Sequence, residues 1–172
     1  MSQRGGAVTD SEVGVNGLFL VDGERHADNH LHLEHQAAHT RSRAHYAGGM
    51  ANKGRGVFNG MIHVLQAAQK TDAALNNKNL LLTQGAEIDT KPELEIYADD
   101  VKCAHGSTTG QLDAASLFYL RTRGVPQQVA RNMLVQAFAV EVVQQLANES
   151  LREYIQNSVE QRLNDLVAVI ET

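Results

Sequence analysis

Cys103 and His105 are the residues whose types and spacing best suit chemistry in this 172-residue chain. Cys103 is the single cysteine, and His105 follows it by two positions. On an extended backbone successive side chains alternate between two faces, so Val101, Cys103 and His105 share one face while Lys102 and Ala104 occupy the other. A thiolate beside an imidazole suits transition metals that accept sulfur ligands. Because a closed zinc or iron site uses three or four protein ligands, the pair also fits a buried cysteine that fills apolar space.

A row of histidines forms a second candidate site. Six of the eight histidines fall within 20 residues: His26, His30, His32, His35, His39 and His45. Imidazole is a common metal ligand, and alternation places His30 and His32 on one face of a strand with Leu31 and Leu33 facing the core. The metalloprotease pattern H-E-x-x-H is not met, because Gln36 stands where the general base belongs. A solvent-facing histidine row without a metal is the alternative.

Composition limits the classes of function. Hydrophobic residues make up 42% of the chain, which is long enough to bury a core. The formal net charge is -5 and the basic residues are scattered, which argues against a nucleic-acid partner. One cysteine forms no internal disulfide, and the sequence has no long apolar run of the kind that crosses a membrane. We therefore expect a cytoplasmic chain that binds neither nucleic acid nor membrane.

Short strands separated by turns are expected up to residue 110. The turn-forming runs Asn76–Asn79 and Thr90–Pro92 are expected to separate strands. The segment 47–60 is rich in glycine but lacks the Gly-Lys-Ser/Thr ending of a phosphate loop. No strict period is visible, so these residues leave a parallel β-helix and a β-sandwich both open. The expected strands cover residues 13–21, 57–65, 79–83, 86–89 and 93–97.

Helices are expected after residue 110. Asp113 is a good N-cap for a helix over 114–123, and Gly124 ends it. Pro126 begins a helix over 127–147, and another follows the break at 148–150. The two long helices should form an antiparallel pair that docks on the strands, on a partner, or on both. Their apolar stripes are Val129, Met133, Phe138 and Val142, and then Leu151, Ile155, Val159, Leu163, Leu166 and Ile170.

Three segments carry a resemblance to a known family. They read KGRGVFNG at 53–60, AEIDTKPELEIYADDVKCAHG at 86–106 and LFYLRTRG at 117–124. Between residues 40 and 150 the chain resembles the SufD family, the non-ATPase scaffold subunits of the Suf iron–sulfur cluster assembly complex. The related SufB scaffold subunits share the fold, but the run YADDVKC at 97–103 favours the SufD family.

The resemblance implies a mainly β fold with α-helices. Residues 1–110 would form the C-terminal part of a right-handed parallel β-helix, and residues 111–172 a helical domain. Family members carry a helical region and further strand repeats before this part, so the chain is expected to be a trimmed or naturally short form. It would act as a scaffold and not as an enzyme.

The resemblance also implies partners and a cargo. The β-helix would pair with SufB, and the helices in 113–147 would dock the ATPase SufC. A transient iron–sulfur cluster would be shared with SufB, with no tightly held cofactor in the isolated chain. His105 would lie at the SufB interface as a ligand or proton handler, with Cys103 as the second candidate. The alternatives are a stand-alone metal-binding enzyme built on the His26–His45 row and a structural homodimer.

Overall fold

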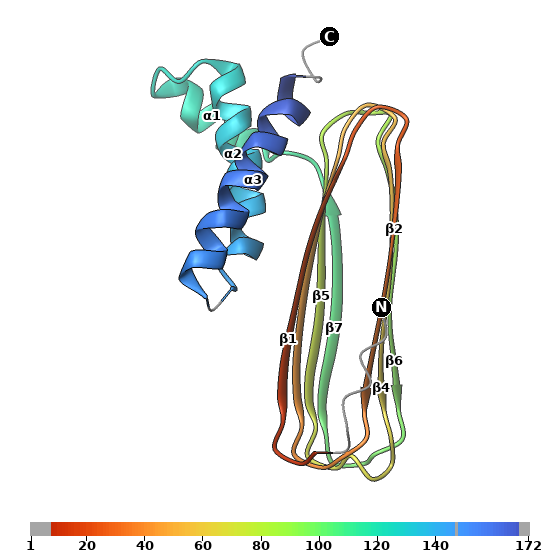
Figure 1. Cartoon of the computed structure of the whole chain (residues 1–172). Coiled ribbons are helices and arrows are strands. Elements are labelled where there is room, and N and C mark those ends of the chain that lie inside the picture. The colour runs from red at the N-terminus through yellow and green to blue at the C-terminus, as the bar shows by residue number, and fades with distance from the viewer. Residues whose placement is uncertain (1–7, 147, 169–172) are drawn as a thin grey trace.

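The computed structural model describes residues 8–146 and 148–168, which form strands followed by helices (Figure 1). The strands are β1 (Glu12–Val21), β2 (His26–His35), β3 (Arg41–Met50), β4 (Arg55–Val64), β5 (Asp72–Leu81), β6 (Glu87–Ile96) and β7 (Lys102–Gly110). The helices are α1 (Ala114–Thr122), α2 (Gln127–Val143) and α3 (Glu149–Ala168).

The strands alternate between two parallel sheets. One sheet has the order β1-β3-β5-β7, which we call sheet A, and the other has the order β2-β4-β6, which we call sheet B. Every neighbouring pair is parallel, so the chain winds as a solenoid between two facing sheets (Figure 1). This confirms the expected parallel β-helix and excludes the sandwich.

The coils repeat at nearly constant length. Glu12 pairs with Arg41, Arg41 with Asp72, and Asp72 with Lys102, so the steps are 29, 31 and 30 residues. The turns absorb these differences, so the register is preserved while the sequence shows no exact period. Each strand position therefore stacks on its equivalent one coil away, and like positions form rows across the sheet.

Inward-facing side chains form a narrow apolar core between the sheets. In β4, which covers most of the strand expected at 57–65, every second residue is buried. Phe58 lies at the centre, with its ring centroid 4.7 Å from that of Tyr46. The buried members of this core are Phe19, Val21, Ala44, Met50, Phe58, Ile62, Val64, Ala68, Ala73, Leu75, Ala86 and Ala98.

The turn expected at Asn76–Asn79 is wrong, because these residues lie within β5. Asn77 and Asn79 point inward and are buried. The Nδ2 of Asn79 donates to Oδ1 of Asn77 at 2.5 Å, and Thr90 Oγ1 on β6 donates to the same oxygen at 2.8 Å. Asparagine is tolerated here because its amide groups satisfy one another and a hydroxyl from the facing sheet.

The turn expected at Thr90–Pro92 is also wrong, because β6 runs unbroken from Glu87 to Ile96. Pro92 has no N–H to give to a ladder, yet it is accommodated because β6 lies at the edge of sheet B. Thr90 points toward the interior, where its hydroxyl completes the asparagine pair. The two short strands expected on either side are therefore one strand.

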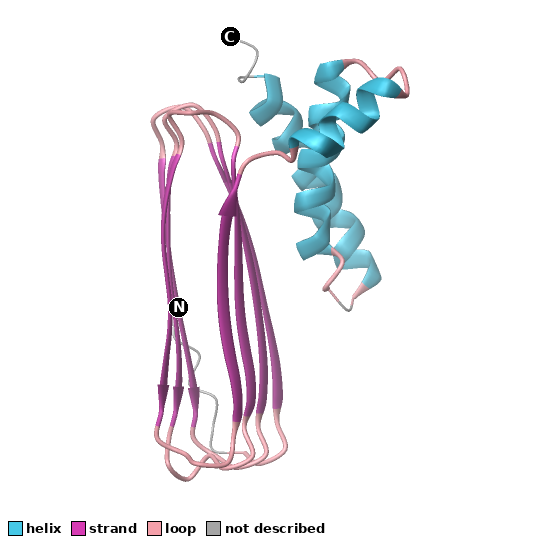
Figure 2. Cartoon of the chain, turned by 180° about the vertical axis from the view of Figure 1, so that it is seen from behind, coloured by secondary structure: helices cyan, strands magenta, loops and turns pink. Residues whose placement is uncertain are grey.

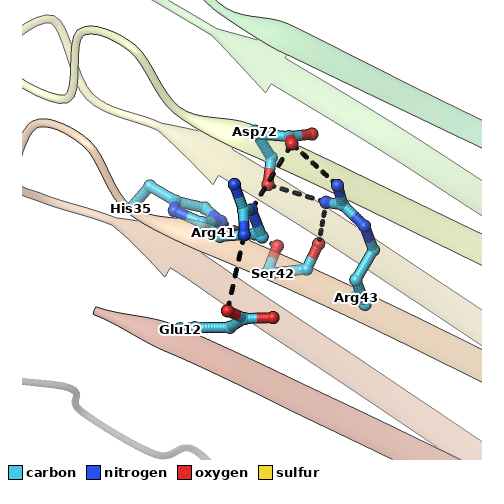
Figure 3. Close-up of polar contacts among 6 residues, drawn as sticks. All are labelled: Glu12, His35, Arg41, Ser42, Arg43 and Asp72. Carbon is cyan, nitrogen blue, oxygen red and sulfur yellow. Dashed lines mark hydrogen bonds and ion pairs between the residues drawn. The ribbon is translucent and has the colours of Figure 1, made fainter. Parts of the chain in front are cut away.

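Rows of opposite charge tie the coils together on the outer face of sheet A. Figure 3 shows Arg41 between Glu12 and Asp72, the residues paired with it on β1 and β5. Nη1 of Arg41 lies 3.6 Å from Oε2 of Glu12, and Nε of Arg41 lies 3.5 Å from Oδ2 of Asp72. Nη2 of Arg43 lies 2.7 Å from the same oxygen of Asp72. The hydrogen bond from Arg43 holds the pKa of Asp72 below its usual value. Asp72 therefore stays ionised and links neighbouring coils.

Helices α1 and α2 begin where the sequence predicts, but α2 ends at Val143, before the expected residue 147. Asp113 accepts hydrogen bonds from the backbone N–H groups of Ala115 and Ser116, which confirms the N-cap. Gly124 adopts a φ of 84° after α1, a conformation that favours glycine. Helices α2 and α3 run antiparallel (Figure 1). Ala147 and Ile170, which belong to the expected helix and stripe, lie outside the described residues.

The helical pair docks on the outer face of sheet A (Figure 2). Two ion pairs cross the junction: Lys78 with Glu141 at 2.5 Å, and Arg162 with Asp22 at 3.3 Å. A second apolar core joins the two parts; its buried members are Ala51, Leu80, Val135, Ala139, Leu163 and Leu166. Of the two docking surfaces expected for the helices, the strands are therefore confirmed.

The apolar stripe expected for α2 is displaced. Its buried residues are Ala130, Val135, Ala139 and Val143. Val129 and Met133 are instead 48% and 46% exposed. Phe138 of the expected stripe still packs against the second core, so the part of the stripe that lies outside the junction is its N-terminal half. This leaves apolar surface on α2.

No helix among residues 8–146 and 148–168 is long and apolar enough to cross a membrane. The division of the chain at residue 110 remains a prediction: β7 ends at Gly110 and α1 begins at Ala114, but the second core is shared between the strands and the helices.

Candidate functional site at the open end of the β-helix

Cys103 and His105 lie on β7, the last strand of sheet A. Cys103 pairs with Ala73 and His105 with Leu75, both of which are buried and face the interior. The two side chains therefore share the inward face of β7, as alternation predicted. In the described chain sheet B ends at β6, one strand earlier in the winding, so the inward face of β7 is only partly covered and His105 is exposed.

His105 reaches from sheet A to the facing sheet. Its Nδ1 lies 2.8 Å from the carbonyl oxygen of Pro92 on β6. A carbonyl oxygen only accepts, so Nδ1 carries a proton and donates, and in the neutral ring Nε2 holds the free lone pair. A histidine that ligates a metal usually donates its other ring N–H in this way, which fixes the ring orientation and the tautomer. His105 is therefore prepared to act as a ligand or a base through Nε2.

Cys103 is partly buried beside the apolar core. Burial raises the pKa of its thiol, the nearby Asp72 carboxylate raises it further, and a hydrogen bond from the Ala73 backbone opposes them. The thiol is therefore protonated at neutral pH and is a poor nucleophile in this state. It would become a ligand only when an arriving metal displaces the proton.

Hydroxyl groups at this end were missed by the reading of the sequence. Ser107, the next inward residue of β7, lies with its Oγ 3.1 Å from the Oγ1 of Thr90. Thr90 in turn donates to the buried Asn77. A polar row thus leads from the interior to the exposed end, beside His105. Asn77 and Thr90 lie 13 residues apart in the sequence, and Thr90 and Ser107 lie 17 apart. Their contact depends on the length of one coil, which the sequence did not reveal.

The histidine row is divided by the structure. His26, His30 and His32 are exposed on the outer face of β2, while Leu31 and Leu33 face the core, which confirms the solvent-facing arrangement for these three. His39 lies in a turn with a φ of 60°, and His45 lies on β3 in the other sheet. The six histidines therefore do not converge on one site.

His35 departs from the row because it is buried at the end of β2. Its Nδ1 lies 2.7 Å from Thr40 Oγ1 and its Nε2 lies 2.9 Å from Ser42 Oγ. The two hydroxyls can satisfy a neutral ring, one as donor and one as acceptor. Burial lowers the pKa of His35, so the folded protein keeps it neutral. Its role is to close a corner of the coil.

This burial predicts a loss of stability in mild acid. The unfolded chain binds a proton on His35 at higher pH than the folded chain does. The part of the free energy of unfolding that depends on a neutral His35 is therefore complete above about pH 6.5 and decreases below it. We expect His35→Gln to flatten the pH dependence of the urea midpoint between pH 7 and pH 5. His26→Ala, which changes an exposed histidine, should leave the dependence intact, and equal slopes for wild type and His35→Gln would contradict the assignment.

Comparisons with known proteins identify the family of the chain. The family described as "SUF system FeS cluster assembly, SufBD core domain" matches residues 7–138. The chain is 44% identical over 154 residues to the iron–sulfur cluster assembly protein SufD of Escherichia coli K12, covering 90% of this chain and 36% of that protein. It is 39% identical over 142 residues to an iron–sulfur cluster assembly SufBD family protein of Synechocystis, covering 83% of this chain and 31% of that protein. The chain thus spans about a third of the length of these relatives.

Proposed function

Because the chain belongs to the SufBD core family of the SUF iron–sulfur cluster assembly system, we propose that it is a scaffold subunit on which a nascent cluster is built. It acts in the cytoplasm and performs no catalysis alone. The cluster is its cargo, shared with a SufB partner and released afterwards. The whole assembly includes the ATPase SufC.

The orientation of His105 is the observation that carries this proposal. The hydrogen bond to the Pro92 carbonyl directs the free Nε2 away from β6, at a strand with an unpaired edge. An imidazole can replace a thiolate as a ligand to iron, and incomplete ligation by one chain suits a cluster that must leave. Cys103 is the second ligand candidate, and the partner supplies the others.

The free edge of β7 is the surface we assign to SufB. Beyond β7 the described part of sheet A has no further strand, so its outer edge presents unpaired N–H and C=O groups. A strand from a partner can add to such an edge and continue the sheet. That addition would place the partner's residues next to His105.

The helices are the surface we assign to SufC. Val129 and Met133 on α2 and Phe118 on α1 are exposed, although such side chains usually pack inside. Their apolar surface lies within 113–147, outside the junction with sheet A. An ATPase docked there would be connected to the β-helix through the second core.

The experiment co-expresses the chain with SufB and SufC, purifies the complex through a tag on this chain, and measures iron and acid-labile sulfide. We expect His105→Ala to retain both partners and to lose most of the iron and sulfide. His30→Ala changes an exposed histidine of the other sheet. This variant should retain both partners and the normal content of iron and sulfide. Loss of cluster from His30→Ala with normal content in His105→Ala would overturn the assignment and favour the histidine row.

A further inference from the structure

A second group of ligand-type side chains lies on the outer face of sheet B. One ligand atom from each of His32, Glu34 and His63 lies within 4.8 Å of the other two. His32 and Glu34 come from β2 and His63 from β4. We propose that these three residues bind one divalent transition-metal ion of the zinc type.

The register of sheet B places the three ligands together. Glu34 pairs with His63 across the two strands, and His32 lies two positions before Glu34 on the same face. Leu33, Ile62 and the other alternate residues point into the core, so the ligand residues are held on the outer face. Parallel strands in fixed register make a rigid base for such a site.

The distances already approach those of a coordinated ion. Nδ1 of His63 lies 3.4 Å from Oε2 of Glu34. Two ligands at zinc distances of about 2.0–2.1 Å in tetrahedral geometry are separated by about 3.4 Å. The rings of His32 and His63 meet edge to face with centroids 6.2 Å apart, so the exposed His32 completes the set by rotating its side chain. Two imidazoles and a carboxylate form a common donor set for divalent transition metals.

Neighbouring residues orient the ligands. The Nε2 of Gln36 donates to Oε1 of Glu34, leaving Oε2 beside His63. This hydrogen bond is the main cause that lowers the pKa of Glu34, so the carboxylate is ionised and ready to bind a cation. The ring of Tyr97 packs edge to face against that of His63, with centroids 5.5 Å apart. Such supporting contacts are typical of metal sites.

The surroundings favour a cation and leave the site open. Glu95 pairs with His63 on the next strand, so its carboxylate adds negative charge to the same face. The helices dock on sheet A, and in both views the outer face of sheet B is free of them (Figures 1 and 2). The histidine row therefore contributes one member, His32, to a site whose other histidine lies on a different strand.

Isothermal titration calorimetry with Zn²⁺ tests the site. The parent protein is the full chain carrying Cys103→Ser and His105→Ala, so that Zn²⁺ binding at the open end does not contribute to the measured heat. We expect one equivalent of Zn²⁺ to bind. His63→Ala and Glu34→Gln should each weaken binding at least ~tenfold, a loss of about 1.4 kcal/mol or more. His26→Ala, on the same face of β2, should bind as the parent does.

Cobalt gives an independent readout, because bound Co²⁺ in a tetrahedral site absorbs visible light more strongly than the hexaaqua ion. We expect this band in the parent and in His26→Ala and its loss in His63→Ala and His32→Ala. Circular dichroism establishes that each variant is folded. Absence of Zn²⁺ binding by the parent, or undiminished binding in folded His63→Ala and Glu34→Gln, would overturn the proposal. Neither outcome bears on cluster assembly at His105.

Discussion

Phe58→Ala is expected to lower the free energy of unfolding by about 3–5 kcal/mol, the largest effect of any single change considered. Phe58 is fully buried between the sheets and packs against Tyr46. A Cβ built on Gly60 would lie 2.9 Å from the Phe58 ring, which shows how completely the neighbouring space is filled. The strands around Phe58 are held in register by their ladders, so they close the cavity only in part and the lost contacts are not recovered.

Urea denaturation followed by far-UV circular dichroism measures this effect. Phe118→Ala is the matched control, because Phe118 is 68% exposed on α1 and its removal should change the free energy of unfolding by no more than about 0.5 kcal/mol. Similar losses for the two phenylalanines would show that the inward row of β4 is not the core of the β-helix.

Thr108→Pro is expected to cost about 2–3 kcal/mol, whereas Ser107→Pro should cost under about 1 kcal/mol in the isolated chain. The backbone N–H of Lys102 donates to the carbonyl of Thr71, in the loop before β5. In a parallel ladder alternate residues donate to the same neighbour, so the N–H of Thr108 also points to β5 and that of Ser107 points to the free edge. Proline removes a ladder bond only at Thr108.

Thermal and urea unfolding of the two proline variants provide the comparison. Ser107→Pro also removes the hydroxyl contact with Thr90, but that contact is exposed and contributes little. A larger loss of stability for Ser107→Pro than for Thr108→Pro would mean that β7 is paired in a different register, and that His105 does not face the interior.

Local rules were enough to predict the face shared by Cys103 and His105 and the caps of α1. Alternation along a strand and an aspartate before a helix act over a few residues, so neither depends on the rest of the fold. The resemblance supplied the β-helix, which the residues alone left open.

Residues whose environment is set by the coil were misread. Asn77 and Pro92 are turn formers by propensity, but the buried amide pair satisfies one and the sheet edge tolerates the other. His35 was grouped with its exposed neighbours although one position along a strand reverses the face. His63 is the partner of Glu34 because one coil is about 30 residues long. Thr90 meets Ser107 because it lies on the facing sheet, partway along the coil that leads from Asn77 to Ser107.

Binding of purified SufB to this chain and to Ser107→Pro shows whether the partner adds to the free edge of β7, because this substitution changes that edge while preserving the fold. We expect a one-to-one complex with the wild-type chain and at least ~tenfold weaker binding for folded Ser107→Pro, since the added strand loses its hydrogen bond and meets the proline ring. Equal affinity of SufB for the two proteins would show that the partner docks away from His105 and away from the end of the β-helix where we propose that the cluster is built.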